Sequence, residues 1–167
     1  MFLTGYHGTK ITYANEIISS GEFHPSKSKT DWLGSGIYYY FNIKDAYEWQ
    51  DSDAILHSVI RIDESEFLDM DSDVGAKVYN GIIECIEDVL CENIRLSTEH
   101  AQENQCAVMR AIWADHPQIK VISASFATTK TKVRTLLDLR PRRREFCVRD
   151  NSCIKHTFLI KKGDLDD

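Results

Sequence analysis

Long hydrophobic runs, metal-binding cysteine pairs and internal repeats are all missing from this chain of 167 residues. No apolar stretch reaches the roughly 18 residues that a membrane-spanning helix needs. The five cysteines contain no Cys-x-x-Cys pair, and their odd number argues against a closed disulfide framework. Only three prolines and eight glycines occur, so no linker rich in these residues divides the chain. We therefore expect one domain over residues 1–167, with no metal site.

Charge is spread unevenly along the chain. The net charge is −6, and the hydrophobic and charged fractions, 43% and 28%, are typical of a globular protein. The first ten residues lack the basic and apolar regions of a signal peptide, so we expect a cytoplasmic protein. A basic cluster contrasts with this acidic average, and it ends where the third motif described below begins. Its members are Arg140, Arg142, Arg143 and Arg144. The cluster is typical of a solvated face and also suits a phosphate-bearing partner.

Hydrophobic periodicity predicts an α+β protein. Period-two or β-rich patterns predict strands over residues 2–9, 37–41, 54–62, 66–70, 119–127, 145–149 and 156–161. Helical spacing predicts helices over residues 11–20, 44–50, 72–92 and 98–116. Polar residues and proline predict loops over 22–33 and 130–144. Strands at both ends with helices between them indicate the α+β class.

Three short motifs stand at the positions where this pattern places strands. The first is Tyr6-His7-Gly8-Thr9. The second is Gly36-Ile37-Tyr38, followed by a predicted helix that contains Ala46 and carries Trp49 near its end. The third runs from Arg144 to Asp150 and contains Glu145. Taken singly, each has an ordinary structural explanation: a turn histidine, an aromatic core strand and a surface glutamate.

Together, these motifs supply what the cleavage of a nucleotide glycosidic bond requires. An aromatic face can stack on a flat ring, and a histidine ring nitrogen can bond a ribose hydroxyl. A carboxylate stabilises positive charge that develops at the ribose carbon. In this order, the motifs resemble those of the H-Y-E class of ADP-ribosyltransferases, which includes diphtheria toxin and the poly(ADP-ribose) polymerases. The R-S-E class does not fit, because Ser123-Ala124-Ser125 and Glu64-Ser65-Glu66 occur in the reverse order.

The resemblance implies a set of site residues. His7, Tyr38 and Glu145 would be catalytic, and NAD would be the co-substrate. The ligands implied for NAD are His7, Gly8, Thr9, Tyr38, Ala46 and Trp49. In the family, the histidine contacts a ribose hydroxyl, the next glycine grips the nicotinamide carboxamide through its backbone, and two aromatic residues enclose the ring. Ala46 is a departure, because the polymerases have a serine there that binds the carboxamide.

The resemblance also implies a fold and a reaction. The fold would be two packed, mostly antiparallel sheets with an NAD cleft between them, and residues 63–130 would include a helical insertion. The reaction would be mono-ADP-ribosylation of a macromolecule, with protein favoured over RNA or DNA as the acceptor. A chain of this size suits a bacterial or phage toxin or defence effector, delivered to another cell. Two alternatives are an NAD glycohydrolase and a non-catalytic module that binds NAD or ADP-ribose.

Overall fold

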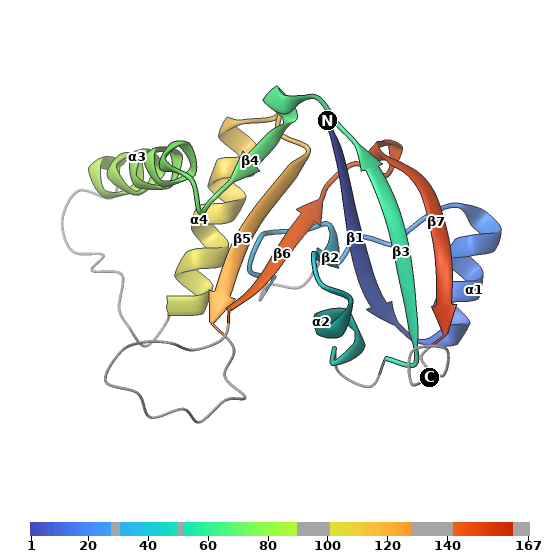
Figure 1. Cartoon of the computed structure of the whole chain (residues 1–167). Coiled ribbons are helices and arrows are strands. Elements are labelled where there is room, and N and C mark those ends of the chain that lie inside the picture. The colour runs from blue at the N-terminus through green and yellow to red at the C-terminus, as the bar shows by residue number, and fades with distance from the viewer. Residues whose placement is uncertain (28–30, 50–51, 90–100, 128–141, 162–167) are drawn as a thin grey trace.

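Seven strands and four α-helices make up the described part of the chain in the computed structural model (Figure 1). The structure describes residues 1–27, 31–49, 52–89, 101–127 and 142–161. The strands are β1 (Phe2–Thr9), β2 (Ile37–Tyr40), β3 (Ala54–Arg61), β4 (Phe67–Asp69), β5 (Val121–Ala127), β6 (Arg142–Val148) and β7 (Ile154–Lys161). The helices are α1 (Ile11–Ser20), α2 (Ile43–Tyr47), α3 (Asp73–Val89) and α4 (Ala101–Asp115). The predicted α+β class is confirmed.

The strands form one sheet in the order β4-β5-β6-β2-β1-β3-β7. Among the described strands, β4 and β5 form the one parallel pair, and the other neighbours are antiparallel. The prediction of two separate sheets is wrong at the level of hydrogen bonding, because β1 and β2 join the two halves. They do so through a single register pair, Tyr6 with Tyr40. Figure 1 shows β4, β5 and β6 on one side of this junction and β1, β3 and β7 on the other.

Several predicted boundaries need correction. Strand β6 begins at Arg142, so the predicted loop over 130–144 is wrong in its last three residues. These residues gain ladder partners on β5 over Arg142–Arg144, which outweighs their poor strand propensity. Residues 130–141 of that loop lie outside the described part. Helix α2 ends at Tyr47, which leaves Trp49 just beyond it. The range 63–130 supplies β4 and β5 to the sheet as well as α3 and α4.

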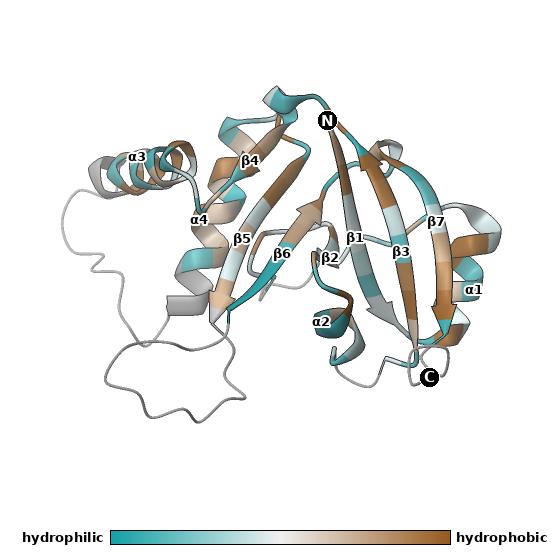
Figure 2. Cartoon of the chain, in the orientation of Figure 1, coloured by the Kyte–Doolittle hydropathy of each residue, from teal (hydrophilic) through white to brown (hydrophobic). Residues whose placement is uncertain are grey.

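Two hydrophobic clusters cover opposite faces of the β5–β6 half of the sheet. One contains Val121 and Phe146 and joins the buried face of α1. The other contains Ile122 and Cys147 and lies under α4, with α3 packed at its edge. Neighbouring residues of a strand point to opposite faces, which explains the division. Figure 2 shows β6 changing from a hydrophilic start to a hydrophobic end, where both faces are covered.

Helix α1 packs against β3 and β7 at the other end of the sheet. Its buried residues, Ala14 and Ile17, recur at helical spacing, as the sequence predicts. Gly21 ends the helix in the left-handed conformation, with φ of 74°, and its N–H donates to the Ile17 carbonyl. No helix in the described part of the chain is long and apolar enough to cross a membrane.

Candidate active site

The sheet separates between β1 and β2, and His7 lies at the point of separation. Strand β1 pairs with β3 along its whole length but with β2 only at Tyr6 and Tyr40. Past that pair, carbonyl groups of β2 that face β1 need other hydrogen-bond partners. The His7 side chain provides one, since its Nδ1 lies 2.8 Å from the carbonyl oxygen of Tyr38. The first two motifs are therefore in direct contact.

This contact fixes the protonation of His7. A carbonyl oxygen only accepts hydrogen bonds, so Nδ1 carries the proton. Burial lowers the pKa of His7 below its usual value, and the hydrogen bond to Tyr38 offsets that effect only in part. The ring is therefore neutral near pH 7, and its Nε2 is an acceptor. Phe23 meets the ring edge-on, and Tyr39 lies beside it. His7 is thus an oriented hydrogen-bond acceptor suited to a hydroxyl group.

The phenol of Tyr38 is committed within the chain. Its hydroxyl accepts a hydrogen bond from the Leu33 N–H and donates one to the Gly34 carbonyl, both at 2.8 Å. Burial raises the pKa of Tyr38 above its usual value, so the phenol stays neutral. These contacts attach the segment before β2 to the strand itself. Tyr38 therefore holds the local backbone in place and presents its carbonyl to His7.

Glu145 lies in the middle of β6, opposite Tyr40 on β2 and Ala124 on β5. Because the two residues pair across β2 and β6, the side chains of Tyr40 and Glu145 lie on the same face of the sheet. Burial raises the pKa of Glu145 from 4.5 to about 7, although Tyr40 and the charge of Arg143 favour the ionised form. The sequence predicted a carboxylate at this position but gave no sign of its burial. The group changes its charge near neutral pH, as a functional carboxylate often does.

Helix α2 packs against β1 beside this pair. The carbonyl of the fully buried Ala46 lies so close to Gly8 that a Cβ there would overlap its oxygen. The same Cβ would lie 3.2 Å from the Cβ of Trp49. A residue without a Cβ is therefore required at position 8 to seat α2. Trp49 is 43% exposed, and its ring lies 6.1 Å from that of Tyr40. The Trp49 side chain is thus partly exposed next to the Tyr40–Glu145 pair.

Arg143 points to the same face of β6 as Glu145, because it lies two positions earlier in the strand. Its Nε lies 3.2 Å from Oδ1 of Asp45 in α2, and a second nitrogen binds the Glu48 carboxylate. The Arg143 side chain is only 17% exposed. Its charge is therefore already paired within the chain.

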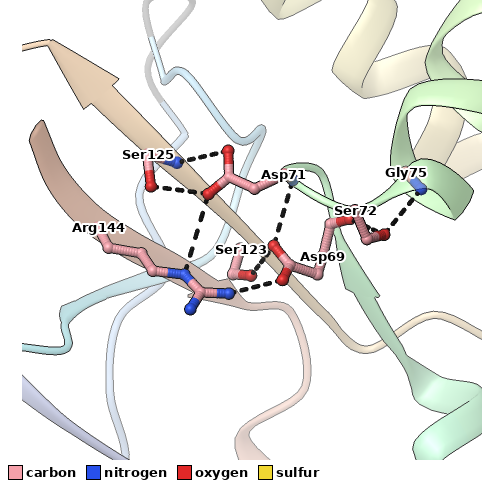
Figure 3. Close-up of polar contacts among 7 residues, drawn as sticks. All are labelled: Asp69, Asp71, Ser72, Gly75, Ser123, Ser125 and Arg144. Atoms are coloured by element: carbon pink, nitrogen blue, oxygen red, sulfur yellow. Dashed lines mark hydrogen bonds and ion pairs between the residues drawn. The ribbon is translucent and has the colours of Figure 1, made fainter.

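Arg144 points to the opposite face and is paired as well (Figure 3). One guanidinium nitrogen lies 2.6 Å from Asp69, and the Arg144 Nε lies 4.0 Å from Asp71. The guanidinium also lies over the ring of Phe41. Hydroxyl groups on β5 donate to the same two aspartates, from Ser123 to Asp69 and from Ser125 to Asp71. This network attaches the turn after β4 to β5 and β6.

Strand β2 connects the predicted site residues, though not in the predicted way. His7 contacts the backbone of Tyr38, whereas Glu145 contacts the side chain of Tyr40. Trp49 has Tyr40 as its aromatic neighbour. Sequence reasoning missed Tyr40, and the signal was available, because period-two alternation places it on the same face as Tyr38.

The other predicted positions divide into described and undescribed residues. Thr9 ends β1, and its carbonyl accepts a hydrogen bond from the Asp53 N–H. Arg142 is exposed at the start of β6, and Arg140 lies outside the described residues. Among the residues that the structure describes, no group of three or more His, Cys, Asp and Glu side chains could hold a metal ion.

Comparison with known proteins adds one partial similarity. A stretch of 47 residues is 43% identical to the Uncharacterized protein MJ0359 of Methanocaldococcus jannaschii. The stretch covers 28% of this chain and 22% of that protein. No family model matches the chain. The similarity therefore assigns neither a family nor an activity.

Proposed function

We propose that this protein is an NAD-dependent mono-ADP-ribosyltransferase of the H-Y-E type. The observation that carries the proposal is that the four-residue strand β2 contacts both other motifs. His7 bonds the Tyr38 carbonyl, and Glu145 faces Tyr40 two residues further on. The single register pair between β1 and β2 joins the two half-sheets at one point, and the proposal places NAD at this junction. The ordered motifs and their convergence on one strand support the same function.

In the proposed reaction, the bond between ribose C1′ and nicotinamide breaks, and its electron pair leaves with nicotinamide. Positive charge then develops across C1′ and the ring oxygen of the ribose. The Glu145 carboxylate stabilises this charge, because it is held within the protein and need not reorganise. A nucleophilic atom of the acceptor bonds to C1′ and releases its proton to Glu145 or to water. Only the ionised form of Glu145 performs both roles.

Binding would use His7, which packs against Tyr39, and Trp49, which lies near Tyr40; Tyr39 and Tyr40 point to opposite faces of β2. Nε2 of His7 would accept a hydrogen bond from a ribose hydroxyl. The partly exposed ring of Trp49, which lies near Tyr40, would stack on nicotinamide. Ala46 offers no hydroxyl to the carboxamide, so binding there would depend on backbone groups. Because Tyr38 uses its hydroxyl within the chain, its contribution would be to position His7.

A macromolecular acceptor is the proposed partner, with protein favoured over RNA or DNA. The described arginines give nucleic acid little additional support, since Arg143 and Arg144 are already paired with carboxylates. A phosphate group would have to displace those carboxylates to bind there. Arg142 is exposed and carries no such constraint.

The test is transfer of label from NAD to macromolecules in a cell lysate. Wild-type protein should label an acceptor and release nicotinamide. Glu145→Gln keeps the size of the side chain but not its charge, so transfer should fall by roughly 100- to 1,000-fold. Digestion with protease or nuclease would then identify the acceptor class.

Other outcomes separate the alternatives. Nicotinamide release that depends on Glu145, without transferred label, would indicate a glycohydrolase. Equal NAD turnover by folded wild type and Glu145→Gln would rule out the proposed catalytic role. NAD binding without turnover in either protein would indicate a binding module.

A further inference from the structure

Arg143 joins two parts of the candidate site that are far apart in the sequence. It extends from β6, two residues before Glu145, to two carboxylates at α2. Asp45 lies within the helix, and Glu48 lies one residue past its end. Both carboxylates bind the same guanidinium through different nitrogens, Nε for Asp45 and a terminal nitrogen for Glu48. Such charge-assisted pairs are stronger and more directional than neutral hydrogen bonds.

Helix α2 needs an external restraint of this kind. It has only five residues, and an isolated helix shorter than about 12 residues is marginal in water. Asn42 caps its first turn through a bond to the Lys44 N–H, and Ala46 seats one side of the helix against Gly8. The opposite attachment, toward β6, is made by Arg143. Together, β1 and β6 hold the short helix from two directions.

The segment that Arg143 restrains carries the partly exposed aromatic side chain of the site. Trp49 lies two residues past the end of α2, and its N–H donates to the Ala46 carbonyl. Its ring lies near Tyr40, which in turn pairs with Glu145 across β2 and β6. Any movement of α2 away from β6 would therefore change the position of Trp49 relative to Glu145.

We infer that Arg143 is a positioning residue that fixes α2, and with it Trp49, relative to Glu145. Its task is to set the geometry of the NAD site and not to bind the phosphates of an acceptor. The inference rests on the proposed function, because it identifies which part of the site sets the alignment of the nicotinamide ring with the carboxylate. A misplacement of about 1 Å in such a site can cost roughly 100-fold in rate.

The charge of Arg143 also acts on Glu145. The titratable groups that face this carboxylate are Tyr38 and Tyr40 on β2, Arg143 on β6 and Asp45 on α2. The positive charge of Arg143 and the Tyr40 side chain favour the ionised carboxylate, and the negative charge of Asp45 opposes it. Removing Arg143 should therefore raise the pKa of Glu145 further. The pH at which NAD turnover reaches half of its maximum should move upward, which a purely structural defect would not cause.

Two variants approach the contact from opposite sides. Arg143→Met removes the charge and keeps much of the side-chain length, whereas Asp45→Asn with Glu48→Gln removes both partners. Lys44→Gln is the matched control on α2, because its exposed side chain lies outside the contact. Thermal unfolding would establish that every variant is folded before its kinetics are compared.

The first measurement is nicotinamide release from NAD without added macromolecule. Arg143→Met and the double variant should both lose roughly 10- to 100-fold in kcat/KM for NAD, and Lys44→Gln should match wild type. If Arg143 instead binds acceptor phosphates, its loss would only raise the KM for the acceptor. The double variant would then free the guanidinium and improve acceptor binding. That pair of results would overturn the inference while leaving the proposed function intact.

The second measurement does not depend on NAD turnover. Hydrogen exchange of backbone amides over residues 43–49 should be several-fold faster in both variants and unchanged in Lys44→Gln. Unchanged exchange in Arg143→Met would show that α2 needs no restraint from β6 and would refute the inference. If wild type and all variants fail to turn over NAD while exchange still increases, the proposed function fails and the structural contact stands.

Discussion

Glu145→Gln should stabilise the fold above neutral pH while it removes the proposed catalytic charge. Burial raises the pKa of Glu145 from 4.5 to about 7 in the folded protein. Between these values the folded state binds more protons than the unfolded state, so stability falls as pH rises through this range. The full penalty is present above about pH 7 and absent below about pH 4.5. At about 1.4 kcal/mol for each tenfold change in proton affinity, it amounts to about 3 kcal/mol. The glutamine side chain of the variant does not ionise, so the variant escapes this penalty.

Urea unfolding of the two proteins at pH 5 and pH 8 would measure this effect. Glu145→Gln should exceed wild type by about 2–3 kcal/mol at pH 8, and the difference should shrink markedly at pH 5. Glu22→Gln is the control, because Glu22 is exposed. That change should alter stability by less than about 0.5 kcal/mol at either pH.

Two results would refute this reasoning. Equal stability of Glu145→Gln and wild type at pH 8 would mean that the carboxylate is not held in a state that resists ionisation. A variant that is less stable at both pH values would mean that the contacts of the ionised carboxylate with Tyr40 and Arg143 outweigh its burial. In either case NAD turnover should not depend on a group that titrates near pH 7.

Two further substitutions test how the site is supported. Gly8→Ala should cost about 1–3 kcal/mol and lower NAD turnover, because its Cβ would overlap the backbone of Ala46. Gly81→Ala, in a helix with open space around it, should instead stabilise by about 0.5–1 kcal/mol, and thermal unfolding of both variants compares them. Trp113→Phe should cost about 1–3 kcal/mol in urea unfolding, because it leaves the Leu33 carbonyl without the buried 2.7 Å bond from the indole N–H. Unchanged stability in Gly8→Ala or in Trp113→Phe would contradict these contacts.

The local elements of this fold could be predicted because each depends on neighbouring residues. The helix after β1 shows its apolar spacing and its glycine cap at Gly21 in the sequence itself. The turn chemistry around Asp150 likewise predicted the break between β6 and β7, which the fold fills with a 3₁₀ turn over Asn151–Cys153. Such signals need no knowledge of what lies across the sheet.

The site's electrostatics could not be predicted, because they depend on partners distant in the sequence. Nothing near Arg143 indicates that Asp45 and Glu48, almost a hundred residues earlier, would bind its guanidinium. From the sequence, the arginine cluster is typical of a solvated face and also suits a phosphate-bearing partner, whereas the fold pairs Arg143 and Arg144 with carboxylates. The sequence also could not show which tyrosine of β2 lies opposite Glu145. The register between β2 and β6 decides this, and it selects Tyr40.

The sheet order explains why the motifs are so widely spaced. Strand β2 lies between β1 and β6, so its two neighbours come from the first residues of the chain and from near its end. A site assembled on β2 must then take its histidine from early in the sequence and its glutamate from late in the sequence. The intervening residues extend the sheet through β5 and β4 and add α3 and α4, of which α4 covers the hydrophobic cluster that contains Cys147 of β6. Changes in α3, which packs at the edge of that cluster, can therefore alter stability or the surface offered to an acceptor without changing the His7–Tyr38 contact or the Tyr40–Glu145 pair.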